Sequence, residues 1–275
     1  MTWQRYDLIF RLQSPLHIGF RKVGNLMQTR RYVPGKNLWA ALTERLTRMA
    51  FLAPAFRDYE GIGEALRTYF RFGYLYPALK EGERMRVYYP WQDARHFDYR
   101  FLDSYASTAL AGADHAAAAG ALHEVEFIRP YARPLGQELS QPVYLKGVLY
   151  VQPAWPSDSP LAAWQKALAR IQMGGERSYG WGRLRLVSPL KGEQAPKPEW
   201  DVSEGEYARA HVLAPAGAGV EGLVEPLVGW ERGDPDQGRY WRLTPRPLVA
   251  YQPGSKMTQP LHVTLHAWGM WEVAS

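Results

Sequence analysis

Cysteine is absent from the 275 residues of this chain. Its absence excludes disulfides, thiolate zinc sites, iron–sulfur clusters held by cysteine and a cysteine nucleophile. No stretch approaches about 18 uninterrupted apolar residues, the length that a membrane-spanning helix needs. The first seven residues, MTWQRYD, hold no apolar segment of the kind that a secretory signal carries. We therefore expect a cytoplasmic protein without a membrane segment.

Acidic residues are scarce in two segments of the chain. Residues 1–50 hold nine Lys and Arg against two acids, a net charge of +7, and residues 170–191 hold five against one, a net charge of +4. The whole chain carries only +6, so the remainder is net negative. If the two basic segments meet in the fold, they form one face suited to a polyanion. Arginine outnumbers lysine 25 to 8, which suits phosphate recognition, although a genome that prefers arginine codons gives the same ratio.

Hydrophobic periodicity predicts an α+β fold. Alternation over residues 4–13 predicts a strand, and helical spacing over residues 36–50 and from Leu161 to Ile171 predicts two amphipathic helices. Further strand patterns lie at residues 84–89, 125–128, 143–151 and 183–187. The resulting order over residues 1–190 is that of a ferredoxin-like (RRM-like) β-α-β-β-α-β module with an insertion around residues 55–121.

The C-terminal third has a different composition. Residues 191–206 are rich in Pro, Glu and Gly and are interpreted as a linker, whereas residues 207–275 are Pro- and Trp-rich with short strand patterns and predict a β-rich C-terminal region. The phrases YVPG (residues 32–35) and YQPG (residues 251–254) echo each other. We take the echo as chance unless the structure shows a duplicated module.

A glycine-rich segment, residues 174–182, joins the second predicted helix to the strand that follows. It is not a P-loop, because Trp181-Gly182 replaces the required Lys-Ser/Thr, and its helix–loop–strand order excludes a dinucleotide fingerprint. Its glycines let backbone N–H groups converge on a phosphate, and its aromatic rings offer stacking faces for bases. The alternative is a tight turn whose aromatic side chains merely pack. The residues assigned to RNA binding here are Gly174, Gly175, Arg177, Tyr179, Gly180, Trp181 and Arg183.

Residues 17–32 are expected to form a charged loop that leads into the first helix, whose N-terminal N–H groups would be available to a phosphate. The RNA-binding candidates in this part are His17, Arg21, Lys22, Asn25, Arg30, Arg31, Lys36 and Asn37. Histidines and carboxylates are otherwise dispersed, and no spacing typical of a metal site or a catalytic triad occurs. We therefore expect neither a metal nor a cofactor.

Two of these segments resemble a known family. SPLHIG (residues 14–19), followed by the charged loop and YVPGKNLWAAL (residues 32–42), resembles the N-terminal signature of the RAMP superfamily (repeat-associated mysterious proteins) of CRISPR systems. GGERSYGWGRL (residues 174–184) looks like the superfamily's glycine-rich loop. The resemblance implies RRM-like folds that bind CRISPR RNA inside a multi-subunit antiviral effector. The implied partners are the guide RNA, backbone RAMP subunits and the large polymerase-like subunit.

The superfamily contains three kinds of subunit. Backbone subunits of type III complexes cleave target RNA with an Asp after the first strand, but residues 14–35 contain no Asp. Segments 24–35 and 222–229 look most like the subunit that caps the 5′ end of the guide RNA in type III-D-like complexes. The resemblance therefore implies a non-catalytic subunit that grips the repeat-derived 5′ tag. The alternatives are a metal-independent endoribonuclease that processes repeat RNA, with His17 as general acid/base and Lys36 stabilising the phosphorane, and a generic single-stranded RNA binder.

Overall fold

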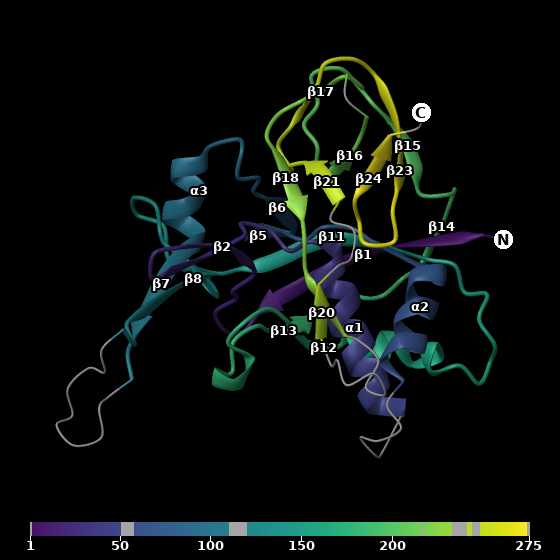
Figure 1. Ribbon diagram of the computed structural model, residues 1–275, viewed down its shortest axis with the longest axis horizontal. Helices are drawn as coiled ribbons and strands as arrows, with labels where there is room; N and C mark the ends of the chain where they lie inside the picture. The colour runs from purple at the N-terminus through teal and green to yellow at the C-terminus, as the bar shows by residue number, and fades with distance from the viewer. Residues whose placement is uncertain are drawn as a thin grey trace.

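The computed structural model describes residues 2–50, 58–109, 120–215, 217–232, 241–243 and 248–273, and they form an α+β fold dominated by strands (Figure 1). Its main sheet has the order β12-β13-β1-β11-β5-β6, with β14 also paired to β1 and β4 to β11. These strands are β1 Trp3–Leu12, β4 Phe70–Phe72, β5 Tyr76–Glu81, β6 Arg84–Val87, β11 Tyr144–Val151, β12 Arg170–Gln172, β13 Arg183–Leu186 and β14 Glu193–Ala195. The predicted first strand is therefore a central strand, paired antiparallel with both β11 and β13.

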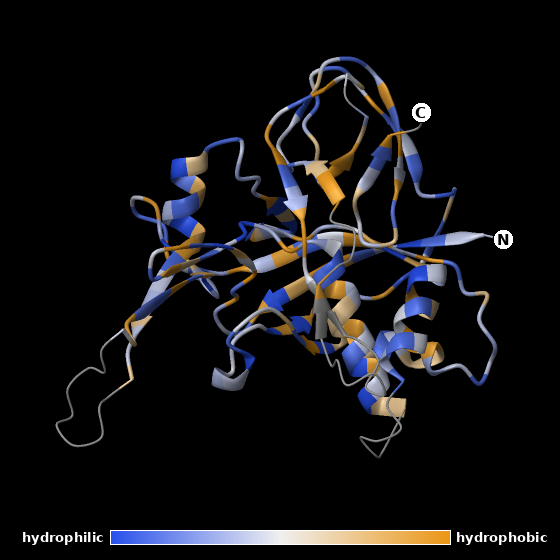
Figure 2. Ribbon diagram, in the orientation of Figure 1, coloured by the Kyte–Doolittle hydropathy of each residue, from blue (hydrophilic) through white to orange (hydrophobic). Residues whose placement is uncertain are grey.

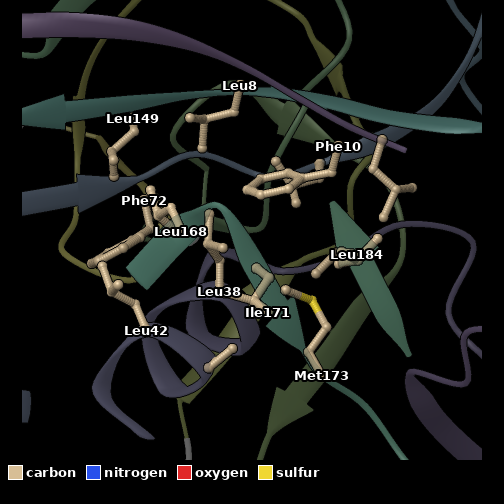
Figure 3. Packing of buried hydrophobic residues seen from close by; sticks show 14 of the residues in the cluster. Leu8, Phe10, Leu38, Leu42, Phe72, Leu149, Leu168, Ile171, Met173 and Leu184 are labelled. Carbon is tan, nitrogen blue, oxygen red and sulfur yellow. The ribbon is translucent and has the colours of Figure 1, made fainter. Parts of the chain in front are cut away.

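Helix α1 (Gly35–Ala50) covers one face of this sheet and confirms the helix predicted from periodicity. Its residues Leu38, Leu42 and Leu46 are completely buried or nearly so, since positions three and four apart share one face of a helix. Figure 3 shows Leu38 and Leu42 directed toward Phe10 and Leu8 of β1. Each such leucine stabilises the fold by about 1.5–3 kcal/mol relative to an exposed one.

Two further helices complete the described helical layer of the module. Helix α2 (Tyr59–Tyr69) begins at Asp58, whose side chain accepts a hydrogen bond from the Gly61 amide, and packs against α1. The second predicted helix is shorter than expected: a 3-10 turn (Pro160–Ala163) and α4 (Trp164–Leu168) bury its apolar face, but Ile171 already belongs to β12. In Figure 2, α1 and α2 carry both hydrophilic and hydrophobic residues, as amphipathic helices do. No helix in the described ranges has the length and apolar character needed to cross a membrane.

A second, four-stranded sheet has the order β2-β3-β8-β7 and projects from the main one (Figure 1). Its strands are β2 Gly19–Val23, β3 Leu26–Thr29, β7 Leu102–Ser107 and β8 His123–Ile128, and α3 (Ala94–Phe101) precedes β7. The prediction of a loop over residues 17–32 is thus wrong. Gly24 (φ +59°) and Asn25 form the two-residue turn of a hairpin, a dipeptide that favours such turns.

The C-terminal third forms a six-stranded sheet with the order β15-β23-β24-β16-β21-β18. Its strands are β15 Glu199–Val202, β16 Val212–Leu213, β18 Val224–Leu227, β21 Leu248–Tyr251, β23 Leu261–Leu265 and β24 Trp271–Val273. Short pairs surround it: β9 Tyr131–Ala132 with β10 Gln141–Pro142, β17 Val220–Glu221 with β22 Lys256–Met257, and β19 Trp230–Arg232 with β20 Trp241–Leu243. The predicted linker over residues 191–206 is not a free segment, because β14 pairs with β1 and β15 pairs with β23.

Two hydrophobic cores hold these sheets together. The larger lies between the main sheet and its helices. The smaller lies where the C-terminal sheet meets the main sheet, and it contains Tyr32, Tyr74 and Tyr76 from the first part of the chain with Val212 and Val263 from the last. Burial of these tyrosines therefore attaches the two parts to each other.

Candidate nucleic-acid interface

The glycine-rich segment lies against residues 15–17, which are about 160 positions away in the sequence. The Gly175 amide donates a hydrogen bond to the His17 carbonyl oxygen (2.9 Å), and the Gly182 amide donates one to Pro15 (2.7 Å). The side-chain amide of Gln172 donates hydrogen bonds to the carbonyl oxygens of Arg177 and Trp181 and so holds the segment in place. The two motifs that carried the family resemblance thus meet in the fold.

The glycines of this segment are required by backbone geometry. Gly174, Gly180 and Gly182 have φ values of +85°, +85° and +74°, which disfavour any other residue. A Cβ on Gly182 would lie 1.8 Å from the Met173 carbonyl oxygen, and one on Gly175 would lie 2.9 Å from the His17 ring. Close packing against neighbouring residues is therefore a sufficient reason for these glycines, whether or not the segment also contacts a phosphate.

His17 is buried in this contact. Only 8% of it is exposed, and its Nδ1 lies 2.7 Å from the Glu126 carbonyl oxygen in β8. Because that oxygen only accepts, Nδ1 donates the hydrogen bond. His17 thus positions the glycine-rich segment against β8.

A basic groove runs beside the glycine-rich segment, between α1 and the edge of the main sheet. It encloses a cavity of about 450 Å³. Glu44, Gln13 and Gln172 line it. Five arginines line it as well: Arg45, Arg48, Arg170, Arg183 and Arg185. We call this feature the arginine groove.

Most of the positive charge in the arginine groove has no internal counter-ion. Arg45, Arg170, Arg183 and Arg185 are exposed, and none of them makes an ion pair with a residue that the structure describes. Arg170 lies directly opposite Arg185 in the sheet, and Arg11 lies opposite Arg185 on the other side. Like charges in register destabilise a sheet unless an anion balances them. The groove is therefore suited to a chain of phosphates.

Arg177 connects the glycine-rich segment to the groove. Its guanidinium bonds the Glu44 carboxylate of α1 (2.6 Å), which also pairs with Arg48 one helical turn further on (2.7 Å). The two cations share one acid, so the local balance remains positive. Arg177 is thus a tether between loop and helix as well as a positive charge.

The two aromatic candidates of the segment differ in their surroundings. Tyr179 is 80% exposed, so one face of its ring is open to a base. Trp181 instead packs edge-on against Phe127 (ring centroids 5.0 Å apart) and near Tyr105, both on the projecting sheet. Tyr179 is therefore the stronger stacking candidate, and Trp181 joins the segment to the second sheet.

The hairpin β2–β3 carries Arg21, Lys22 and Asn25 on an exposed surface. The Arg21 guanidinium donates to Gln28 on the facing strand (2.6 Å) and lies over the Phe20 ring. The Asn25 carbonyl oxygen accepts from Glu124 of β8. These candidates lie on the projecting sheet, apart from the arginine groove.

Arg30 and Arg31 are engaged within the molecule. The Arg30 guanidinium forms two hydrogen bonds with Glu225 (2.8 and 3.2 Å), and Arg31 bonds Asp98 of α3 (2.6 Å). Glu225 also accepts from His211, whose other ring nitrogen meets the Tyr74 hydroxyl at 2.6 Å. Burial alone would raise the pKa of Glu225, but its bonds with His211 and Arg30 outweigh burial and lower that pKa to about 2.

The start of α1 differs from the open anion site that the sequence predicted. A Cβ on Gly35 would lie 2.1 Å from the Phe72 carbonyl oxygen and 2.5 Å from that of Trp268. The Lys36 ammonium lies 4.7 Å from the centre of the Trp268 ring, and the Asn37 amide donates to Pro34 within the chain. Carbonyl oxygens and an indole therefore lie close to this helix end, and the Asn37 amide is already bonded within the chain.

Four arginines of the groove escaped the residue-level prediction: Arg45, Arg48, Arg170 and Arg185. The charge count had placed all four in the two basic segments. The sequence could not show that these arginines lie together, because α1 and the β12–β13 edge become neighbours only through the strand order of the main sheet. Alternating arginines at residues 183 and 185, on the side of β13 opposite the buried Leu184, were the usable signal.

No protein-family model and no curated protein sequence matches this chain. Its fold is similar to that of a chain in the cryo-EM structure of the Type III-B Cmr-beta bound to cognate target RNA and AMPPnP, with a TM-score of 0.54 and 12% identity over 91% of this chain and 85% of that one. A chain of the Type III-B Cmr-beta bound to cognate target RNA gives a TM-score of 0.51 and 11% identity over 91% and 86%. The α+β fold expected from the sequence is confirmed, and these chains share it. At this level of identity the likeness concerns the fold.

Proposed function

We propose that this chain is a non-catalytic RNA-binding subunit of a type III-like CRISPR effector and that it grips the repeat-derived 5′ tag of the guide RNA. The arginine groove carries the proposal, because it gathers from segments far apart in the sequence exposed guanidinium groups that form no ion pair with the residues the structure describes. Phosphates would lie along Arg45, Arg170, Arg183 and Arg185, and a base would stack on Tyr179.

The arrangement of the main sheet supports this proposal. The strand order β13-β1-β11-β5, with α1 following β1 and α4 following β11 in the chain, is compatible with the predicted ferredoxin-like module, and we propose this module for the chain. We further propose residues 1–190 as this module, with its insertion around residues 55–121, and residues 207–275 as a second unit. Similarity in fold to chains of RNA-bound Type III-B Cmr-beta adds to the case for a subunit that works beside other subunits and RNA.

The proposal predicts selective binding without cleavage. Purified protein should bind repeat RNA more tightly than a scrambled RNA of the same length and composition, measured by fluorescence anisotropy in EDTA. Equal affinity for both would favour a generic single-stranded RNA binder instead.

The same reactions test the endoribonuclease alternative. His17 is the acid/base candidate, and its Nδ1 is engaged with the Glu126 carbonyl oxygen. We expect the repeat RNA to remain intact on a denaturing gel, because His17 is buried and held against β8. Site-specific cleavage in EDTA that His17→Ala abolishes would contradict a non-catalytic role.

A further inference from the structure

A second cavity, of about 310 Å³, lies where the hairpin β2–β3, the start of α3 and the turn at residues 251–254 meet. Its lining includes Phe20, Arg30, Arg31, Trp91, Glu126 and Gln252. We call it the junction cavity. It adjoins the projecting sheet rather than the arginine groove, and residues from both halves of the chain build it.

The charges around the junction cavity are nearly balanced, unlike those of the arginine groove. Arg30 pairs with Glu225, and Arg31 pairs with Asp98. Glu126 and Arg21, neither of which makes an ion pair with a described residue, add one charge of each sign to the lining. A phosphate therefore gains little here, whereas a neutral polar ring meets no excess charge.

The remaining lining consists of aromatic rings and amides. Phe20 is 39% exposed, and Trp91 is held in place by stacking on Tyr89, with centroids 5.0 Å apart and planes 23° apart. The side-chain amide of Gln252 makes no hydrogen bond to any residue that the structure describes. Flat apolar walls with a few polar groups at the edge are the usual features of a site for a small planar ligand.

A continuous set of contacts links the junction cavity to the glycine-rich segment. Glu126 lines the cavity, its carbonyl oxygen bonds His17, and the His17 ring packs against Gly175. The neighbouring Phe127 contacts Trp181. Strand β8 thus connects the junction cavity to the glycine-rich segment.

The two similar phrases at residues 32–35 and 251–254 both contribute residues to the junction cavity. Tyr32 comes from the first phrase and Gln252 and Pro253 from the second, and all three line the cavity. Gly254 of the second phrase has φ +93°, and a Cβ there would lie 3.0 Å from the Trp91 ring. The second phrase thus forms a close turn against the cavity wall.

We propose that the junction cavity takes up a single unstacked nucleobase of the RNA whose phosphates lie in the arginine groove. This inference rests on the proposed function and adds base recognition to it. Phe20 and Trp91 would contact the faces of the base, and Gln252 and Glu126 would bond its edge. RNA-binding proteins that read sequence commonly do so on splayed bases of single strands.

The test is a scan of abasic substitutions. Guide RNAs that lack one base at a time are titrated against wild type, Phe20→Ala and Gln252→Ala, and each affinity is measured by anisotropy. In wild type, removal of one particular base should weaken binding by a factor of about 5 to 150, the range that a stacked base contributes. In Phe20→Ala and Gln252→Ala the same removal should have a much smaller effect.

Two matched variants control for folding and for general surface changes. Tyr207→Ala removes an exposed aromatic ring from the C-terminal part, and Gln165→Ala removes an exposed amide from α4. Both should retain the wild-type scan, and all variants are compared by thermal unfolding.

The outcomes separate the two proposals. Suppose that binding depends on the groove arginines but that no base removal has a smaller effect in Phe20→Ala or Gln252→Ala than in wild type. The cavity then does not hold a base, and only this inference is overturned. A side chain of a partner protein in the cavity would give this result. If wild type fails to bind the RNA, both proposals are overturned.

Discussion

Gly182 illustrates how a single residue constrains the glycine-rich segment. Its φ is +74°, and its amide and carbonyl groups bond Pro15 and Met173. The sequence indicated that the glycines here allow a close approach of the backbone, and three of them have positive φ. It could not indicate that the neighbour in contact is the backbone after β1, because nothing local in residues 174–182 specifies that partner.

We predict that Gly182→Ala destabilises the protein more than Gly24→Ala. Both glycines have positive φ, which costs alanine about 1–2 kcal/mol. A Cβ on Gly24 meets open space, whereas one on Gly182 collides with the Met173 carbonyl oxygen. Urea unfolding should show a larger loss of unfolding free energy for Gly182→Ala, and equal losses would mean that the segment relaxes freely.

At the scale of elements, helices and strands could be predicted where they have a regular hydrophobic pattern. Helix α1 and strand β1 each bury one regular face, and both were predicted to within two residues at either end. Strand β2 is exposed along its whole length, so it has no alternation to detect, and a hairpin looked like a charged loop. The short α4 shows the limit of periodicity, since Ile171 continues the helical spacing from a strand.

Glu44 provides a test of the electrostatics of α1. It is the one acid among the residues that line the arginine groove, and it pairs with both Arg48 and Arg177. We predict that Glu44→Gln increases RNA affinity about two- to tenfold at low salt, because it removes a negative charge near the phosphates. Anisotropy titrations at low and high salt measure the effect, which should shrink as salt rises.

Glu64→Gln is the matched control for this variant. Glu64 also pairs with an arginine on a helix, Arg67, but it lies on α2 and does not line the groove. Its loss should leave RNA affinity unchanged. A decrease in affinity on Glu44→Gln would show that the tether to Arg177 contributes more than the removed charge.

At the scale of the whole molecule, a buried polar network joins the N-terminal and C-terminal parts. Arg30 and Tyr74 come from the first part, and His211 and Glu225 come from the second. Burial raises the pKa of Tyr32 beside this network to about 12 and lowers that of His211, so the histidine is neutral in the fold. Neither the network nor the smaller core could be predicted, because they join residues as far apart in the sequence as Tyr74 and His211 (137 positions) or Arg30 and Glu225 (195 positions).

The network makes stability depend on pH. The folded pKa of His211 lies below its ordinary value of 6.5, so the unfolded chain binds the extra proton first and stability falls as pH drops below about 6.5. For Glu225, the contribution is present above the ordinary pKa of 4.5 and is lost as pH falls toward about 2. We predict that thermal unfolding temperatures of wild type decrease between pH 7.5 and 5.5 and that His211→Gln shows a weaker dependence over this range.

His262→Gln is the control for the pH experiment. His262 bonds Asp201 on the surface, with its side chain 48% exposed. This variant should keep the wild-type pH profile. A profile of His211→Gln that parallels wild type would exclude the buried network as the source of the acid sensitivity.

The salt dependence of RNA affinity tests the central claim most directly. Each phosphate contact that a single strand loses should reduce the slope of log K against log salt by about 0.7. The groove variant changes to glutamine four arginines that lack an ion pair within the described part of the chain: Arg45, Arg170, Arg183 and Arg185. Its control changes four exposed arginines that do not line the groove: Arg84, Arg86, Arg95 and Arg209. We predict that the groove variant loses about 3 from the slope and most of the affinity, while the control stays close to wild type. Equal slopes for both variants would contradict the assignment of the arginine groove to RNA.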